Sequence, residues 1–107
     1  MMIDNTVLTE AVYYILLSLF DPLHGYGIIL NTEKLSDGRV RLAAGTLYGA
    51  ITALLNKHWI EALPGVGNSR KKEYIITDEG KSVVEQELTR LRELLSNGEK
   101  ITGGADQ

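Results

Sequence analysis

The residues best suited to chemistry in this chain are cations and small polar side chains that fit a polyanion. Three consecutive basic residues, Arg70, Lys71 and Lys72, stand between two apolar segments. An earlier stretch with helical periodicity has an outer face without acidic residues, consisting of Thr46, Gly49, Thr52, Ala53 and Lys57. Lysine and arginine bind phosphate oxygens, and a helix of this kind can approach base edges in a DNA groove. The two features favour nucleic-acid binding.

Charge is segregated along the sequence. The net charge is −3, yet residues 39–72 hold six basic residues and one acidic residue, while the rest holds five basic and thirteen acidic residues. The six basic residues are Arg39, Arg41, Lys57, Arg70, Lys71 and Lys72. We expect a positive surface on an acidic body. Chance clustering of solvated charges is the alternative interpretation.

Catalysis and metal binding have little support. The chain has no cysteine, and Asp21, His24, His58 and Glu61 are the only conceivable catalytic set. They match no catalytic triad, metal-ligand spacing or phosphate-binding glycine loop. We therefore expect no enzyme activity, metal or cofactor. No apolar stretch approaches the roughly 20 residues that span a bilayer, so we expect a cytoplasmic protein.

The pattern predicts a mainly α fold with a small β-wing, a winged helix-turn-helix plus a C-terminal dimerisation helix. Expected helices cover residues 7–20, 24–35, 44–56 and 78–96, and expected strands cover 59–63 and 73–77. Alternation at 39–42 suggests a third strand. The predicted domain spans residues 1–97, followed by a disordered tail at 98–107.

Apolar periodicity also indicates which helix faces are buried. Leu47, Ile51, Leu54 and Leu55 form the expected inner face of the third helix, and Tyr26, Ile29, Leu30 and Leu35 that of the second. The last helix carries a seam of Val84, Leu88, Leu91 and Leu95, which is longer than a small core can cover. We expect it to pair with Leu8, Val12 and Ile15 in the first helix of a second copy. Packing on its own chain alone is the alternative.

Three segments resemble a known family. They are residues 23–27 (Leu-His-Gly-Tyr-Gly), 44–50 (Ala-Gly-Thr-Leu-Tyr-Gly-Ala) and 72–80 (Lys-Glu-Tyr-Ile-Ile-Thr-Asp-Glu-Gly). In this order and spacing they resemble the PadR-like transcriptional regulators, specifically the smaller subfamily with a single C-terminal helix. The resemblance covers about residues 8–95.

The resemblance implies a homodimeric winged-helix repressor whose C-terminal helix packs on the N-terminal helix of its partner. Gly45, Thr46, Leu47 and Tyr48 would begin the recognition helix, with Tyr48 a candidate phosphate contact, and Arg70, Lys71 and Lys72 would form the basic wing. Some relatives bind small aromatic compounds between subunits. Trp59 could line such a cavity, although core packing is the favoured role.

One departure from the family pattern concerns the turn after the third helix. Where the family often has Lys-Gly-Leu-Ile, this chain has Lys57, His58, Trp59 and Ile60. A glycine there would favour a left-handed helix cap, so we expect His58 to make the turn differently.

The functional expectation is a DNA-binding repressor that places two recognition helices on a pseudo-palindromic operator in double-stranded DNA. Thr46 and Thr52 are the candidates for sequence preference, and DNA shape would contribute because strong base-reading side chains are few. A winged-helix module that binds another protein instead of DNA is the alternative.

Overall fold

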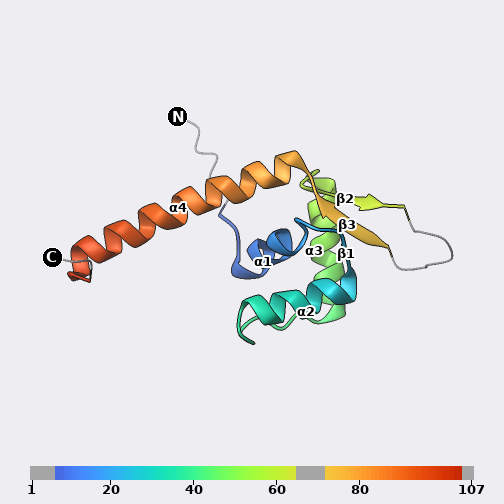
Figure 1. Ribbon diagram of the computed structural model, residues 1–107, viewed down its shortest axis with the longest axis horizontal. Coiled ribbons are helices and arrows are strands. Elements are labelled where there is room, and N and C mark those ends of the chain that lie inside the picture. Colours follow the sequence, from blue (N-terminus) through green and yellow to red (C-terminus); the bar gives the residue numbers. More distant parts are fainter. Residues whose placement is uncertain (1–6, 65–71, 105–107) are drawn as a thin grey trace.

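The computed structural model describes residues 7–64 and 72–104, so Arg70 and Lys71 lie outside the described residues. The elements are α1 (Glu10–Ser18), β1 (Leu23–His24), α2 (Gly25–Leu35), α3 (Ala44–Asn56), β2 (Ile60–Leu63), β3 (Glu73–Ile76) and α4 (Asp78–Thr102). Helices α1 to α3 gather beside a small sheet, and α4 extends away from them (Figure 1). The mainly α fold with a β-wing is as predicted.

The sheet has three antiparallel strands in the order β1-β3-β2. Leu23 in β1 lies opposite Tyr74 in β3, and Ile60 in β2 lies opposite Ile76. The prediction of a strand at 39–42 is wrong, because the third strand is β1. Residues 39–42 instead follow a turn in which the Ser36 hydroxyl accepts a hydrogen bond from the Val40 amide at 2.9 Å.

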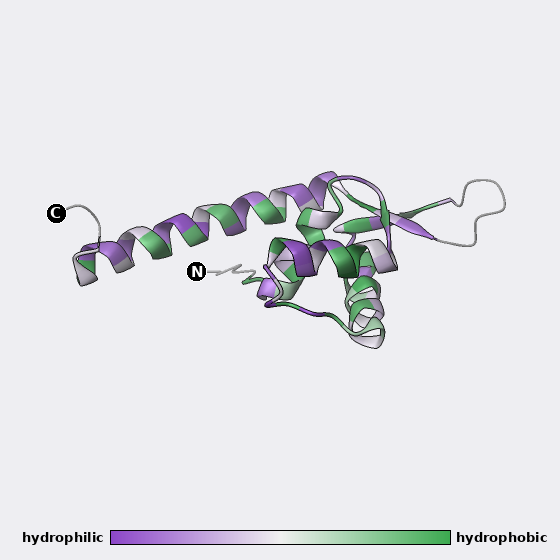
Figure 2. Ribbon diagram, turned by 60° about the horizontal axis from the view of Figure 1, so that its bottom comes forward, coloured by the Kyte–Doolittle hydropathy of each residue, from purple (hydrophilic) through white to green (hydrophobic). Residues whose placement is uncertain are grey.

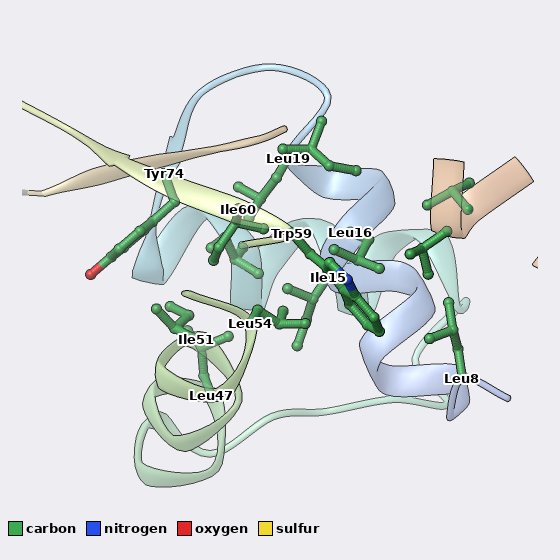
Figure 3. Packing of buried hydrophobic residues seen from close by; sticks show 14 residues of the cluster. Leu8, Ile15, Leu16, Leu19, Leu47, Ile51, Leu54, Trp59, Ile60 and Tyr74 are labelled. Atoms are coloured by element: carbon green, nitrogen blue, oxygen red, sulfur yellow. The ribbon is translucent and has the colours of Figure 1, made fainter. Parts of the chain in front are cut away.

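The core lies where the three short helices meet the sheet. The helices contribute Ile15, Leu16 and the capping residue Leu19 from α1, Ile28 from α2, and Leu47, Ile51 and Leu54 from α3. The wing and the start of α4 add Trp59, Ile60, Tyr74, Ile76, Val83 and Val84. Figure 3 shows Trp59 among the labelled side chains of α1 and α3. Among the described residues, no helix is long and apolar enough to cross a membrane.

The buried face of α2 differs from the expected one. Ile28 and Thr32 are fully buried and Ile29 is partly buried, whereas Tyr26, Leu30 and Leu35 are exposed. The apolar periodicity was ambiguous because α2 carries apolar residues on more than one side. The neighbouring helices α1 and α3 select the side that contains Ile28.

The end of α3 is a left-handed cap, although no glycine is present. His58 adopts φ 64°, and its amide donates to the Leu55 carbonyl at 3.0 Å while the Trp59 amide donates to Leu54 at 3.1 Å. This is the Schellman pattern of hydrogen bonds. The expectation that His58 makes the turn differently is therefore wrong, because the histidine takes the conformation itself.

The start of α4 is joined to the end of α3. The Thr77 hydroxyl donates to the His58 carbonyl at 2.7 Å and accepts from the Gly80 amide at 3.0 Å, which caps α4. The Thr77 amide donates to the Trp59 carbonyl at 2.9 Å. A Cβ at Gly80 would lie 2.2 Å from that same carbonyl oxygen, so only glycine allows this approach.

Helix α4 is longer than predicted. It continues through Asn97 and Gly98 to Thr102 and ends at Gly103, which has φ 74°. The predicted end at Ser96, and a tail beginning at residue 98, are therefore wrong. A glycine inside a long helix costs only about 1 kcal/mol, whereas Gly103 supplies the left-handed cap that ends one. Apolar residues recur along the whole of α4 (Figure 2).

A buried carboxylate on α4 is paired with an arginine one turn further along the same helix. Glu87 is 3% exposed, and its carboxylate accepts from Arg90 Nε at 2.9 Å and Nη2 at 2.5 Å. The hydrogen bonds from Arg90 lower the pKa of Glu87; burial opposes this shift, and a backbone hydrogen bond from Leu8 reinforces it. This carboxylate is therefore held in its charged form beside α1.

We predict that Gly80→Ala destabilises the fold by about 2 kcal/mol or more, because the new methyl group collides with the Trp59 carbonyl. Gly98→Ala on the same helix is the control, since a Cβ there meets nothing within 4 Å. It is expected to stabilise by roughly 0.5–1 kcal/mol. Urea denaturation measures both, and equal stability of the two variants would contradict the prediction.

We predict that Glu87→Gln lowers the free energy of unfolding at neutral pH by about 1–3 kcal/mol, because Arg90 loses its ionic partner. The pKa of Glu87 lies below its ordinary value of 4.5, so its contribution is complete above that value and is lost as pH falls through the lowered pKa. The gap between wild type and variant should therefore shrink in acid. Denaturation between about pH 3 and pH 7 measures it. Glu85→Gln, at an exposed position, is the control.

Candidate nucleic-acid interface

The outer face of α3 is exposed over its first half. Gly45, Thr46, Tyr48, Gly49 and Thr52 are all exposed, and Tyr48 retains 49% of its accessible surface. Leu47 is fully buried in the core, so its predicted place among the DNA contacts is corrected: it anchors the helix.

Gly45 and Gly49 have no structural reason to be glycine. A Cβ at either position would meet nothing within 4 Å, and neither has a positive φ. Glycine inside a helix destabilises it by roughly 0.5–1 kcal/mol relative to alanine. The two lie one turn apart on the same face, and this face can be approached closely by another molecule.

The side chain of Tyr48 spans from α3 to the start of α2. A Cβ on Gly25 would lie 2.2 Å from the Tyr48 hydroxyl oxygen, so the absence of a side chain at Gly25 makes room for the phenol. The His24 side chain, at the N-cap position, makes no capping hydrogen bond to α2.

The described part of the wing brings Lys72 next to this region. Lys72 is exposed and immediately precedes β3, where Glu73 pairs with His24 at the start of α2. Burial, and secondarily the proximity of Tyr48, raise the pKa of Tyr74 in the same strand. Tyr48 is therefore close to the wing as well as to α2. Arg70 and Lys71 lie outside the described residues.

The two arginines before α3 are paired within the chain. Arg39 Nε donates to Glu10 Oε2 of α1 at 2.8 Å, and this bond raises the pKa of Arg39. Arg41 Nε lies 3.7 Å from Glu33 Oε2 of α2. Both arginines are exposed, yet their charge is partly offset. Arg39 and Arg41 therefore add less positive charge to this surface than the sequence alone indicates.

Lys57 lies at the opposite end of α3 from Gly45 and Thr46. Its ammonium is 4.8 Å from the centre of the Trp59 ring, in a cation–π arrangement. The helix has 13 residues, so roughly 20 Å separates its two ends. Lys57 therefore lies away from the exposed residues in the first half of α3.

The residues expected at a dimer contact fall into two groups. Ile15 and Val84 are buried within the chain's own core and are not available to a second copy, which corrects that part of the prediction. Leu8 is nearly as buried, with 9% of its surface exposed, while Val12 and Leu88 are partly buried. Leu91 and Leu95 are 38% and 62% exposed and continue the seam beyond the core, with Leu94 and Ile101 beside them.

These features define a class of protein. A helical hairpin that presents α3, followed by a two-stranded wing with a third strand before α2, is a winged helix-turn-helix. The chain belongs to the Transcriptional regulator PadR-like family, whose model matches residues 14–86. Members of this family are transcriptional regulators rather than enzymes, which sets aside a catalytic role for His24 and His58.

Solved structures agree with this assignment. A PadR family transcriptional regulator from Eggerthella lenta superimposes with a TM-score of 0.70 at 26% identity, covering 85% of this chain and 80% of that one. Bacillus subtilis PadR, solved in complex with operator DNA, has the same fold with a TM-score of 0.63 at 24% identity, over 72% of this chain and 45% of that one.

A curated relative is encoded in a transposon. An uncharacterised 37.1 kDa protein of transposon Tn4556 from Streptomyces fradiae is 34% identical over 86 residues, which are 79% of this chain. The chain spans only 24% of the length of that relative.

Proposed function

We propose that this chain is a homodimeric, sequence-specific DNA-binding repressor of the PadR type. The observation that carries the proposal is the pair of exposed glycines, Gly45 and Gly49. Neither position is too crowded for a side chain, so close approach by a ligand is the reason we infer for the two glycines. The first half of α3 is the element that would enter the major groove, where recognition helices make their base contacts.

Two sets of groups suit the DNA backbone. The start of α2, which has no capping side chain, lies beside the Tyr48 hydroxyl, and the amides at a helix start favour an anion such as phosphate. Lys72, with Arg70 and Lys71 from outside the described residues, would bind phosphates on the flanking strand. These contacts would set the position of the protein without reading sequence.

Sequence preference would come from few side chains. The Thr46 hydroxyl is exposed, and the Thr52 hydroxyl donates to the Tyr48 carbonyl at 3.0 Å while keeping its acceptor capacity. Neither forms the paired hydrogen bonds of arginine or asparagine, so DNA shape would contribute strongly.

Dimerisation is supported by the exposed seam of α4. Leu91, Leu94, Leu95 and Ile101 would be covered by the first helix of a second copy, near Leu8 and Val12. A twofold dimer presents two copies of α3 and therefore requires a pseudo-palindromic operator. Relief of repression by a small aromatic ligand completes the proposal. Bacillus subtilis PadR, which was solved with operator DNA, has the same fold and supports the DNA partner.

The test of the proposal is binding to duplex DNA as a function of salt. We expect retention on generic duplex DNA at low salt and a steep loss at higher salt, because bound phosphates release counterions. Lys72→Ala should weaken binding to all sequences and reduce the slope of log K against log salt by about 0.9 for each protomer. Lys100→Ala, on the distant end of α4, is the control. No retention at low salt would favour the alternative, a module that binds protein.

We predict that Gly49→Ala makes the fold more stable but the protein a weaker DNA binder. The methyl group should add roughly 0.5–1 kcal/mol to the free energy of unfolding. It should weaken operator affinity by about tenfold, the size of one good base contact, because α3 can no longer sit as deep in the groove. Ser82→Ala, exposed on α4, is the control and should leave affinity unchanged. Undiminished affinity of Gly49→Ala would remove this face from the interface.

We predict that Leu95→Glu converts the dimer into a monomer at micromolar concentration, because it places a charge in the exposed apolar seam. The matched control is Ser96→Glu, which adds the same charge at the next exposed position, about 100° around α4 from Leu95. Sedimentation equilibrium measures both. A wild-type monomer under these conditions would reject the dimer.

A further inference from the structure

The segment between α2 and α3 carries an exposed arginine on a firmly anchored backbone. Arg41 stands three residues before Ala44, where α3 begins. On one side of it the Val40 amide donates to the Ser36 hydroxyl at 2.9 Å, and on the other Leu42 packs against the core. The segment leaves the end of α2 that lies away from the wing and returns to the start of α3 (Figure 1). Arg41 therefore approaches α3 from the side away from the wing.

The side chain of Arg41 is folded back over the preceding turn. A Cβ on Gly38, which has φ 83°, would lie 3.6 Å from Arg41 Nη2. Arg41 Nε lies 3.7 Å from Glu33 Oε2, which is beyond hydrogen-bond distance. The two side chains are 74% and 43% exposed, and exposed ion pairs of this kind contribute little to stability. Another anion can therefore replace Glu33 at a small cost in free energy.

The neighbouring arginine has a stronger partner. Arg39 Nε donates to Glu10 Oε2 at 2.8 Å, and Arg39 Nη2 donates to the same oxygen. These hydrogen bonds tie the segment to the start of α1. Of the two arginines, Arg41 has the weaker internal contact and stands closer in sequence to α3.

The position of Arg41 suits the edge of a DNA groove. The major groove is about 12 Å wide, so a helix inside it has phosphates on both flanks. Three residues of extended chain span at most about 11 Å, which keeps Arg41 near the start of α3. A guanidinium binds a phosphate through paired, charge-assisted hydrogen bonds, which are stronger than its loose contact with Glu33.

We propose that Arg41 exchanges Glu33 for a backbone phosphate when α3 enters the groove, so that Glu33 competes with DNA for this arginine. The exchange rests on the proposed function and deepens it, because it adds a phosphate contact on the flank away from the wing. Glu33 then lowers the affinity for DNA of any sequence, since a backbone contact reads no bases.

The contact of Arg41 is tested by titrating the full-length protein with generic duplex DNA over a range of salt concentrations. Arg41→Gln should weaken binding and reduce the slope of log K against log salt by about 0.9 for each protomer, whereas Arg41→Lys should keep the slope. Arg92→Gln, the same charge change at an exposed position of α4, is the control and should leave the slope unchanged. An unchanged slope in Arg41→Gln, or a reduced slope in Arg39→Gln instead, would overturn the proposal.

The competition by Glu33 is tested with a double-mutant cycle. Glu33→Gln should tighten DNA binding by about two- to fivefold, the range of an exposed ion pair, because Arg41 no longer has an internal partner. The same change in the Arg41→Gln background should have no effect. Glu85→Gln, at an exposed position of α4, controls for the general loss of a negative charge. A gain that persists without Arg41 would mean that Glu33 simply repels DNA, and the exchange would be wrong.

The outcomes separate this proposal from the proposed function. Thermal melts first establish that every variant is folded. If the wild type is not retained on duplex DNA at low salt, the repressor and the exchange are both rejected. If the wild type binds DNA and the Arg41 and Glu33 variants bind with the same affinity and salt slope, the repressor stands and only the exchange is rejected.

Discussion

The arrangement of the molecule depends on the close contact between Gly80 and the carbonyl of Trp59. This contact brings the start of α4 against the turn that follows α3, and Thr77 completes the joint by capping α4 and binding the His58 carbonyl. The wing leaves from the same turn, since β2 begins at Ile60. Helix α3, the wing and α4 are therefore held in one orientation by a few short backbone contacts. In the proposed dimer, this joint would transmit the geometry of the α4 contact to the two copies of α3.

The proposed DNA binding would rely on fewer unpaired cations than the basic residues in the sequence suggest. Arg39 and Arg41 are each paired with a carboxylate of a preceding helix, and Lys57 lies over Trp59. Among the described residues, the start of α2, the Tyr48 hydroxyl and Lys72 lie beside the exposed face of α3. An acidic protein can bind DNA through such a surface if the groups are preorganised and the helix can approach closely. In the proposed complex, Gly45 and Gly49 would provide that approach, and a Cβ at either position would meet nothing within 4 Å in the described structure.

Helix α4 is buried in the core over its first turns and exposed over the rest of its length. Its first turns complete the core with Val83 and Val84, and Glu87 on the same helix is a buried carboxylate whose charge Arg90 compensates. Beyond Leu88 the apolar seam continues through Leu91 and Leu95, which are 38% and 62% exposed in the described part of the chain. A continuous seam that passes from core to surface is typical of a helix shared between two subunits. It gives the proposed dimer a contact that begins inside each protomer.

The sequence alone determined the elements with strong periodicity. The inner face of α3, the strands of the wing and the start of α4 follow from local patterns, because apolar spacing and the cap at Thr77 act within a few residues. The tertiary structure decided the features that depend on distant neighbours. It selected β1 rather than residues 39–42 as the third strand, and Ile28 rather than Tyr26 as the buried side of α2. It also paired Arg39 with Glu10 and made room for Tyr48 at Gly25, since burial and ion pairing arise from contacts between residues far apart in sequence.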